Sequence, residues 1–377
     1  MSKTLQDYAI LINDTIQSNE INHYITTDNM CQNLGGIDTF KNINIPQGKV
    51  RSFQKDDILL SNIRLYFRKV YRAKQKGGCS SDVLVFRAKH IDSATLFAIL
   101  SSQIFTDYAC SGSQGSKMPR GNKTHMMNFK IPTINFTIAK IFNSIQNKIE
   151  NNHKINELLH KILELLYEQY FVRFDFLDEN NKPYQTSGGK MKFSKELNRL
   201  IPSGWSVRFL NHKIVSTYQP KTISKTLLNN SYSYSVYGGG GIIGRFTEYN
   251  HEQSEFIISC RGQCGISYLT LPKSWITGNA MVIRPTKSYT SKTYLYHTIK
   301  KYKLTNYITG SVQPQITRQN LSTMPILIPK RKILNKWNNI SSLLWNLIHN
   351  NMQSTQTLTA LRDFLLPLLL KQQVKPK

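Results

Sequence analysis

Two loops carry side chains that are suited to reading the edges of nucleic-acid bases. Both contain Gly or Ser and few apolar residues, and their candidate side chains are Lys117, Arg120, Asn122 and Lys123 in the first loop and Gln313, Gln315, Arg318 and Asn320 in the second. In the major groove Arg matches guanine, and Asn or Gln matches adenine, because their paired hydrogen-bonding groups fit those bases. The same residues could instead hold phosphates or cap a turn, since about half of protein–DNA hydrogen bonds reach the backbone.

A second pair of loops offers similar chemistry. One contains Ser61, Asn62 and Arg64, and the other contains Arg261 and Gln263. Arg64 and Arg261 do not align residue for residue. A glycine-rich stretch, residues 237–244, adds Tyr237 and Gly239 to the predicted DNA contacts, because glycine lets a backbone approach DNA or complete a tight turn.

The glycine-rich stretch also satisfies the spacing G-x-G-x-x-G over residues 239–244. A dinucleotide site of that kind requires a helix directly afterwards and an acidic residue about 20 positions later. The following residues, 245–250, have the pattern of a strand and a turn. We therefore predict no nucleotide site here.

Other clusters do not predict catalysis or metal binding. Cys260 and Cys264 lack a second Cys or His pair at the spacing of a zinc site. His153 and His160 lie seven residues apart on a predicted helix, where solvated side chains are expected. Residues 181–184 resemble the Asn-Pro-Pro-Tyr loop of adenine methyltransferases, but Lys182 replaces the first proline. We predict no catalytic residue, no metal and no cofactor in this chain.

The overall charge indicates a polyanionic partner. Lys plus Arg is 49 and Asp plus Glu is 22, which gives a formal net charge of +27 over 377 residues. Duplex nucleic acid is the leading candidate. A membrane is disfavoured because no apolar run approaches the roughly 18 residues of a spanning helix. Five scattered cysteines and an amino terminus without a signal-peptide pattern favour a cytoplasmic location.

Two long helices are predicted to position these loops. Residues 134–171 lack Pro and Gly, and their apolar side chains recur at spacings of three and four, which is typical of a coiled-coil seam. The predicted seam is Ile138, Ile141, Ile145, Lys148, Asn152, Ile155, Leu159, Ile162 and Leu166. A shift of 199 residues gives the second seam, Trp337, Ile340, Leu344, Leu347, Asn351, Ser354, Leu358, Leu361 and Leu365. The paired Asn152 and Asn351 could set the register of the helices or lie solvated at the seam edge.

The segments before the two helices also repeat. Residues 57–61 match 255–259 at a shift of 198, and 85–87 match 282–284 at a shift of 197. Short β-rich runs such as 82–86 and 256–259 alternate with turn signals, which predicts mixed α/β units. Pro132 and Pro329 each stand just before a long helix, where proline is tolerated. The predicted order is globular unit, helix, globular unit, helix.

Taken in order, several stretches resemble specificity subunits of type I restriction–modification systems. They are Tyr24–Asn29, Asp57–Arg64, Gly78–Asp82, Leu166–Val172, Ile201–Trp205 and Tyr237–Gly244, and together with the duplicated helix they span nearly the whole chain. The resemblance implies an α+β fold, with two mixed α/β target recognition domains separated by two long antiparallel coiled-coil helices in a pseudo-twofold repeat. The implied boundaries are recognition domain 1 at 1–133, helix 134–175, linker 176–203, recognition domain 2 at 204–330, helix 331–370 and a basic tail at 371–377.

The resemblance also implies the partners. Each recognition domain would read one half of a split sequence in double-stranded DNA. Two copies of a modification subunit would methylate adenine with S-adenosylmethionine, and restriction subunits would add ATP- and Mg-dependent cleavage. This chain would carry no chemistry of its own.

Two alternatives remain at this point. One is a self-contained DNA methyltransferase or nuclease, although the 22 acidic residues are thinly spread and form no evident cluster. The other is a coiled-coil tether that binds DNA without sequence preference, for which the loops before the helices would be dispensable.

Overall fold

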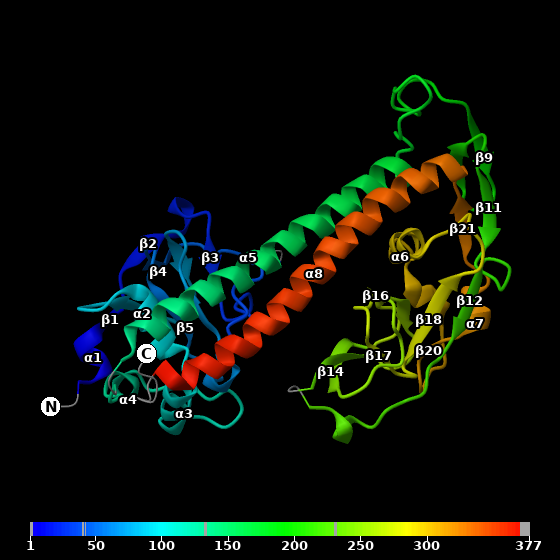
Figure 1. Cartoon of the computed structure of the whole chain (residues 1–377). Coiled ribbons are helices and arrows are strands. Elements are labelled where there is room, and N and C mark those ends of the chain that lie inside the picture. Colours follow the sequence, from blue (N-terminus) through cyan, green and yellow to red (C-terminus); the bar gives the residue numbers. More distant parts are fainter. Residues whose placement is uncertain (1–2, 40, 42, 132–133, 230–231, 370–377) are drawn as a thin grey trace. The chain divides into compact units, whose positions relative to one another are not determined.

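A computed structural model describes residues 3–39, 41, 43–131, 134–229 and 232–369. The chain divides into two units, of which unit 1 comprises Met1–Ile155 with Asn351–Lys377 and unit 2 comprises Asn156–Asn350. Each unit contains one end of each long helix, α5 (Phe136–Tyr167) and α8 (Arg331–Leu369) (Figure 1). Pro132 and the predicted basic tail 371–377 lie outside the described residues.

Unit 1 is built on two four-stranded sheets. The first has the order β1-β8-β5-β6 and is antiparallel throughout, with β1 (Ala9–Ile12), β8 (Val83–Ala88), β5 (Ile58–Ser61) and β6 (Val70–Arg72). The second has the order β2-β4-β7-β3, with β2 (Thr15–Gln17), β4 (Lys49–Phe53), β7 (Gly77–Cys79) and β3 (Tyr24–Ile25). The helices that accompany them are α1 (Leu5–Tyr8), α2 (Ser93–Leu100), α3 (Gln103–Ser111) and α4 (Lys123–Met127).

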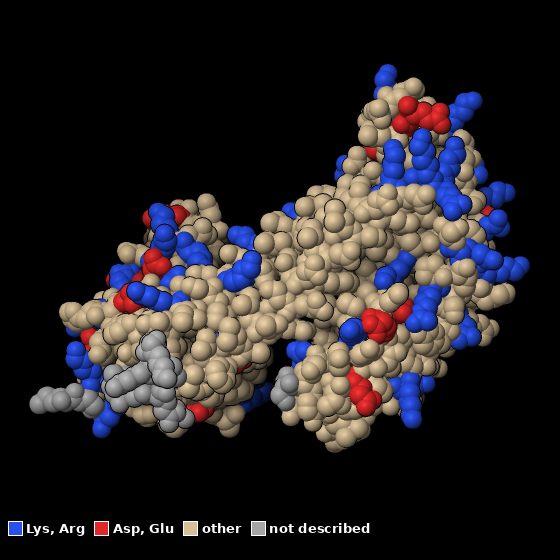
Figure 2. Space-filling view, viewed as in Figure 1, with Lys and Arg blue, Asp and Glu red and all other residues tan. Residues whose placement is uncertain are grey.

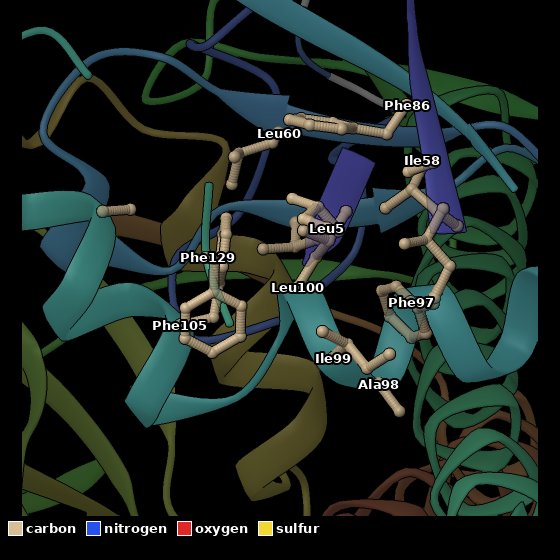
Figure 3. Packing of buried hydrophobic residues seen from close by; sticks show 14 of the residues in the cluster. Leu5, Ile58, Leu60, Phe86, Phe97, Ala98, Ile99, Leu100, Phe105 and Phe129 are labelled. Atoms are coloured by element: carbon tan, nitrogen blue, oxygen red, sulfur yellow. The ribbon is translucent and has the colours of Figure 1, made fainter. Parts of the chain in front are cut away.

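The core of unit 1 lies between the first sheet and its helices. Figure 3 shows Ile58, Leu60 and Phe86 on the strands facing side chains of α2 and α3 such as Phe97 and Phe105. These five side chains are at most 3% exposed. Each large apolar side chain removed from water contributes roughly 1.5–3 kcal/mol, so this layer holds the loops at the strand ends in place.

Unit 2 repeats the antiparallel sheet. Its order is β12-β18-β15-β16, with β12 (Val215–Tyr218), β18 (Ala280–Pro285), β15 (Phe256–Ser259) and β16 (Ser267–Leu269). A three-stranded sheet contains β14 (Gly241–Phe246), β13 (Tyr234–Gly238) and β17 (Trp275–Ile276). Unit 2 also contains β11 (Ser206–Phe209) paired with β21 (Pro325–Ile328), β19 (Ile308–Thr309) paired with β20 (Gln315–Ile316), and helices α6 (Lys292–Lys300) and α7 (Arg318–Leu321).

The repeat predicted from the sequence therefore corresponds to matching strands. Residues 57–61 and 255–259 coincide with β5 and β15, and the β-rich run 82–86 coincides with the start of β8. Both units also join a buried carboxylate before the central strand to an arginine on the next strand. Arg87 donates two hydrogen bonds of 2.8 Å to Asp57, and Arg284 donates to Glu255 at 2.7 and 3.1 Å.

The predicted linker, residues 176–203, includes regular secondary structure. It contains an antiparallel hairpin of β9 (Met191–Ser194) and β10 (Arg199–Pro202). Its first residue, Phe176, is buried and stacks on Trp205, with ring centroids 5.3 Å apart. The Asn and Gly residues of this segment lie in its turns, where they break the regular pattern.

The seam of the helix pair differs from the prediction at every second position. Ile138, Ile145 and Asn152 on α5 are buried, as predicted, whereas Ile141 and Ile155 are 44% and 43% exposed. The buried positions between them are one residue later: Phe142, Ile149 and Leu163 take the places predicted for Ile141, Lys148 and Ile162. Leu159 and Leu166 are half-buried.

The second helix shows the same displacement. Trp337 is buried, and Leu344, Asn351, Leu358 and Leu365 are half-buried as seam positions, but Ile340, Leu347 and Leu361 are exposed. Ser341, Ile348 and Arg362 are buried in their place. Along each helix, the first of these seam residues is followed by the second after four residues and by the third after three more. We predicted a spacing of three and then four, so both spacings are present in the opposite order. α8 continues through Pro367 to Leu369.

A polar layer interrupts the apolar seam within each unit. In unit 1, Asn152 is 1% exposed, and its amide donates to the Thr355 hydroxyl of α8 at 3.2 Å. In unit 2, Asn156 donates to the Ile348 carbonyl of α8 at 3.3 Å. Asn152 is therefore buried and bonded to the opposite helix, which excludes the solvated alternative for that residue. Asn351 is half-buried.

Candidate nucleic-acid interface

The two loops predicted in unit 1 lie against each other. Ile63 and Arg120 form an isolated β-bridge, and the Arg64 amide donates to the Pro119 carbonyl at 2.9 Å. The Arg64 guanidinium also reaches the Lys117 carbonyl at 3.4 Å. We call residues 61–64 together with 114–123 the unit 1 loop face. Its position follows from β5, which ends at Ser61, and from α4, which begins directly after the second loop.

Arg120 has a partner that the sequence did not indicate. Its guanidinium lies 2.9 Å from the carboxylate of Asp82, which stands one residue before β8. The Arg120 side chain is nevertheless 61% exposed, so it can still reach a ligand. Asn122 caps α4 by accepting a hydrogen bond from the His125 amide at 3.0 Å, and the exposed Lys123 opens that helix.

The corresponding loops of unit 2 also converge. Arg261 and Gln315 form a β-bridge, and the Ile316 amide donates to the Cys260 carbonyl at 3.1 Å. Gly239 and Gly240 form the turn between β13 and β14. A Cβ at Gly239 would stand 2.7 Å from the Arg261 carbonyl oxygen, so only glycine allows this close approach. We call residues 239–241, 260–264 and 313–318 the unit 2 loop face.

A small polar groove opens on the unit 2 loop face. Its volume is about 200 Å³, and its lining includes the three predicted residues Arg261, Gln315 and Arg318. The Arg318 guanidinium donates to the Thr217 carbonyl, which fixes one side of the groove. Gln219, which no sequence signal singled out, also lines the groove; it lies directly after β12, and its amide nitrogen donates to the Cys260 thiol at 2.9 Å. Paired donors and acceptors of this kind match the major-groove edges of bases.

Several predicted residues have structural positions instead. Tyr237 is 3% exposed, its hydroxyl accepts a hydrogen bond from the Leu271 amide, and burial raises its pKa to about 12. Ser61 and Asn62 are also buried. Asn320 donates its amide to the Tyr307 carbonyl at 3.0 Å and does not share the capping role of Asn122. The Tyr237, Ser61 and Asn62 side chains are therefore not on the surface where we expected them, and their contact with DNA stays a prediction.

The predicted surface residues are otherwise accessible. The exposed ones are Lys117, Arg120, Asn122, Lys123, Arg261, Gln263, Gln313, Gln315 and Arg318, while Arg64, Gly239 and Asn320 are half-buried. Figure 2 shows further Lys and Arg side chains gathered over the region of β9 and β11. Exposed Lys192 belongs to β9, exposed Arg208 belongs to β11, and exposed Lys195 lies in the turn that follows β9.

The thiols and imidazoles have structural partners. The Cys264 thiol donates to the Pro314 carbonyl at 3.1 Å, and the Cys260 thiol is buried, which raises its pKa. His160 packs edge-on against Trp345, with a centroid distance of 5.0 Å, contrary to the solvated position that we predicted. Among the described residues, no group of three His, Cys, Asp or Glu side chains could hold a metal ion.

The glycine-rich stretch leads into β14 and not into a helix. This agrees with the interpretation of residues 245–250 as a strand, and it gives the stretch the geometry of a hairpin turn. Among the described helices, none combines the length and hydropathy that a bilayer crossing needs.

Comparisons with known proteins point to one family. Residues 202–361 match the type I restriction modification DNA specificity domain. The type I restriction enzyme MjaIX specificity subunit of Methanocaldococcus jannaschii is 21% identical over 311 residues, which cover 73% of this chain and 67% of that protein. The crystal structure of a type I restriction–modification S subunit from M. genitalium has a TM-score of 0.64 at 15% identity, and the match covers 98% of this chain and 96% of that one.

These matches agree with the α+β units and the two long helices described above. The second half of the chain therefore contains a type I restriction modification DNA specificity domain at residues 202–361, and the whole chain has the fold of a type I restriction–modification S subunit.

Proposed function

We propose that this protein reads a split sequence in double-stranded DNA, with one half-site bound by each loop face. The observation that carries the proposal is the convergence of separate loops, in both units, into surfaces lined by Arg, Asn and Gln. These side chains present the hydrogen-bonding pairs that guanine and adenine accept in the major groove. The two half-sites differ in sequence, because unit 1 lacks the glycine-rich stretch 237–244 and its Arg64 does not align with Arg261.

The helix pair acts as a spacer between the two readers. α5 has 32 residues and α8 has 39, and at 1.5 Å per residue they measure roughly 50 to 60 Å. A stiff spacer of that length corresponds to roughly 15 base pairs of B-DNA at 3.4 Å per pair. Since each reader covers several of these pairs, an unread gap of a few pairs remains between the half-sites.

Exposed apolar side chains on the helices supply docking sites for two copies of a modification subunit. In unit 1 these side chains are Ile141, Leu361 and Phe364, and in unit 2 they are Ile340, Ile162 and Leu165. The two sets correspond one to one at the shift of 199 residues. Exposed apolar surface of this kind is typical of protein interfaces, and two equivalent sets fit two copies of one partner. In Figure 2 the visible helix surface carries few charged side chains.

The chemistry belongs to the partners in this proposal. S-adenosylmethionine would be bound by the modification subunit, and ATP and Mg would be bound by a restriction subunit if one assembles with the complex. This chain contributes the sequence reading and the spacing. Its net charge of +27 supports association with DNA, since cationic side chains release counterions from the duplex.

The experiment is methylome sequencing of cells that express this chain together with a candidate modification subunit. We expect adenine methylation within one asymmetric, split sequence that is absent when either protein is omitted. Methylation by this chain alone would support the self-contained methyltransferase. DNA binding without any sequence preference, measured with the purified complex on unrelated duplexes, would support the tether and reject the proposal.

A further inference from the structure

A buried arginine lies in the helix pair of unit 1. Arg362 of α8 is 2% exposed and occupies a seam position. Its Nη1 donates to the Gln146 side-chain oxygen on α5 at 3.2 Å, while its Nε and Nη2 reach the carboxylate of the adjacent Asp363 at 3.0 and 2.9 Å. Burying a guanidinium costs several kcal/mol unless its charge is paired and its N–H groups are bonded. Such a residue is therefore a costly choice for a seam.

Gln146 extends this contact into the globular part of unit 1. The side chain is 1% exposed, and its amide donates to the Leu34 carbonyl at 2.7 Å and to the Glu150 carboxylate at 3.2 Å. One glutamine thus joins α8, through Arg362, to a loop that is 112 residues earlier in the chain. We call Arg362, Gln146 and the Leu34 carbonyl the register clamp.

The loop held by the clamp has an unfavourable backbone. Asn33 and Leu34 have φ values of 53° and 60°, in the left-handed region that non-glycine residues rarely adopt. Such conformations persist only where surrounding contacts fix them. The Leu34 side chain is fully buried, and its carbonyl is bonded to Gln146, so the loop is anchored directly to the helix pair.

The equivalent layer of unit 2 contains no such clamp. The shift of 199 residues relates Gln146 to Trp345 and Arg362 to Leu163, and both of these are buried apolar side chains. Trp345 packs against the rings of Tyr296 and His160. An apolar layer can tolerate small shifts along the helix axis, whereas hydrogen bonds at one seam position specify a single register.

We propose that the register clamp fixes the first recognition domain on the helix pair and thereby determines how strictly one gap length is accepted between the half-sites. This rests on the proposed function, since the gap has meaning only for a split target. Gln146 and Arg362 are positioning residues that do not contact DNA. Their removal widens the set of accepted gaps without changing the half-sites that are read.

The test is the double variant Gln146→Leu, Arg362→Leu, co-expressed with the modification subunit. Replacing a buried polar pair by apolar side chains often preserves stability, so the double variant is more informative than either single change. Methylome sequencing first gives the two half-sites and the native gap. A plasmid library then contains these half-sites at every gap that differs from the native gap by up to three base pairs. We expect the preference for the native gap to fall at least tenfold, with both half-sites retained.

The matched control is Gln353→Leu, Arg331→Leu, which makes the same changes at exposed positions of α8. A second measurement, hydrogen exchange of the free protein at residues 31–37, requires no DNA target. We expect exchange to accelerate at least tenfold in the double variant and not in the control. If the double variant does not fold, we measure the gap preference and the hydrogen exchange on Gln146→Met, in which Arg362 is retained.

The outcomes separate the two proposals. Unchanged gap preference together with unchanged exchange in a folded variant overturns the clamp. Absence of any split target for the unmodified protein overturns the proposed function, and exchange at residues 31–37 then still decides whether the clamp holds the loop.

Discussion

At the scale of single residues, the carboxylate–arginine pairs explain why parts of the repeat are so similar. The Asp57 side chain is 2% exposed and accepts two hydrogen bonds from Arg87 and one from the Gln54 amide. The hydrogen bond to Asp57 raises the pKa of Arg87, as the bond to Glu255 raises that of Arg284. Each pair ties a turn to the central sheet of its unit, so one acid and one arginine occur at equivalent positions in each half.

Removing the charge of Asp57 should therefore destabilise unit 1. Breaking a buried ion pair on one side leaves a charge without its partner, and we expect Asp57→Asn to cost about 2–3 kcal/mol, near the lower end for such pairs because Arg87 is partly exposed. Urea unfolding followed by circular dichroism measures the loss. Asp56→Asn is the control, since Asp56 is half exposed and 3.7 Å from Arg72, and it should cost less than about 0.5 kcal/mol.

Replacing Arg318 should weaken the reading of one half-site only. Its guanidinium lines the unit 2 groove, and loss of a bidentate base contact typically costs about 1–3 kcal/mol. We expect Arg318→Ala to relax one base position of the half-site read by unit 2, and Arg120→Ala to affect the other half-site. Methylation of target libraries by the complex measures both effects. Arg208→Ala, an exposed arginine outside the loop faces, should leave both half-sites unchanged, and equal relaxation by all three variants would contradict the assignment.

Residue chemistry could be predicted from the sequence only in part. The loops with Arg120 and Arg318 were identified by their composition, but Asp82 belongs to an apolar strand run and gave no signal of its pairing with Arg120. Tyr237 was misplaced because a glycine-rich neighbourhood suggests a surface, whereas β13 is buried from Ser235 to Gly238 and includes the Tyr237 side chain. Side-chain direction on a strand depends on the register, which composition does not report.

At the scale of elements, the helices could be predicted and half of their seam could not. Adjacent apolar pairs such as Ile141 and Phe142, or Ile162 and Leu163, satisfy both possible spacings. The structure buries the second member of each pair and exposes the first. We propose that the exposed members bind a partner, and this contact requires them to be apolar. Hydrophobicity alone therefore cannot distinguish the seam of the helix pair from a docking surface.

The helix pair of unit 2 should be sensitive to acid. Burial lowers the pKa of His297 to about 3 and that of His349 to about 4, and it also lowers the pKa of His160. In the unfolded chain these histidines are protonated near pH 6.5, whereas in the folded protein they stay neutral to a lower pH. The free energy of unfolding is therefore unaffected by them above pH 6.5 and decreases as the pH falls from 6.5 toward 4. The expected slope approaches about 1.4 kcal/mol per pH unit for His297 and for His349.

His297→Phe should remove one of these contributions. The His297 ring lies among aromatic rings, including Tyr167 and Trp337, and the nearby charges of Lys300, Lys301 and His160 also disfavour its protonation. Thermal unfolding between pH 7 and 4 should show a smaller loss of stability for the variant than for the unmodified protein. His212→Phe, at an exposed position, should keep the original pH dependence. Identical slopes for all three proteins would mean that His297 does not resist protonation.

At the scale of the whole molecule, we propose that a spacer made of the two long helices sets the gap between the half-sites by its length. The seam repeats about every seven residues, so a seven-residue insertion falls about 20° short of two full turns and keeps the apolar stripe nearly aligned. A four-residue insertion rotates the stripe further and disturbs the pairing. The insertion must also be made in both helices, since residues of α5 bond to partners on α8 in each unit.

We therefore expect one heptad inserted at equivalent positions, after Asn152 in α5 and after Asn351 in α8, to lengthen the spacer by about 10.5 Å, or about three base pairs. Both half-sites should be retained, because neither loop face is altered. Methylome sequencing of cells that express the variant with the modification subunit gives the new gap directly. Seven residues inserted instead in the turn at 178–182, outside the helices, should leave the gap unchanged. A heptad variant that still methylates only the original spacing would show that the helices do not set the gap, because a spacer cannot lengthen without moving the positions it separates.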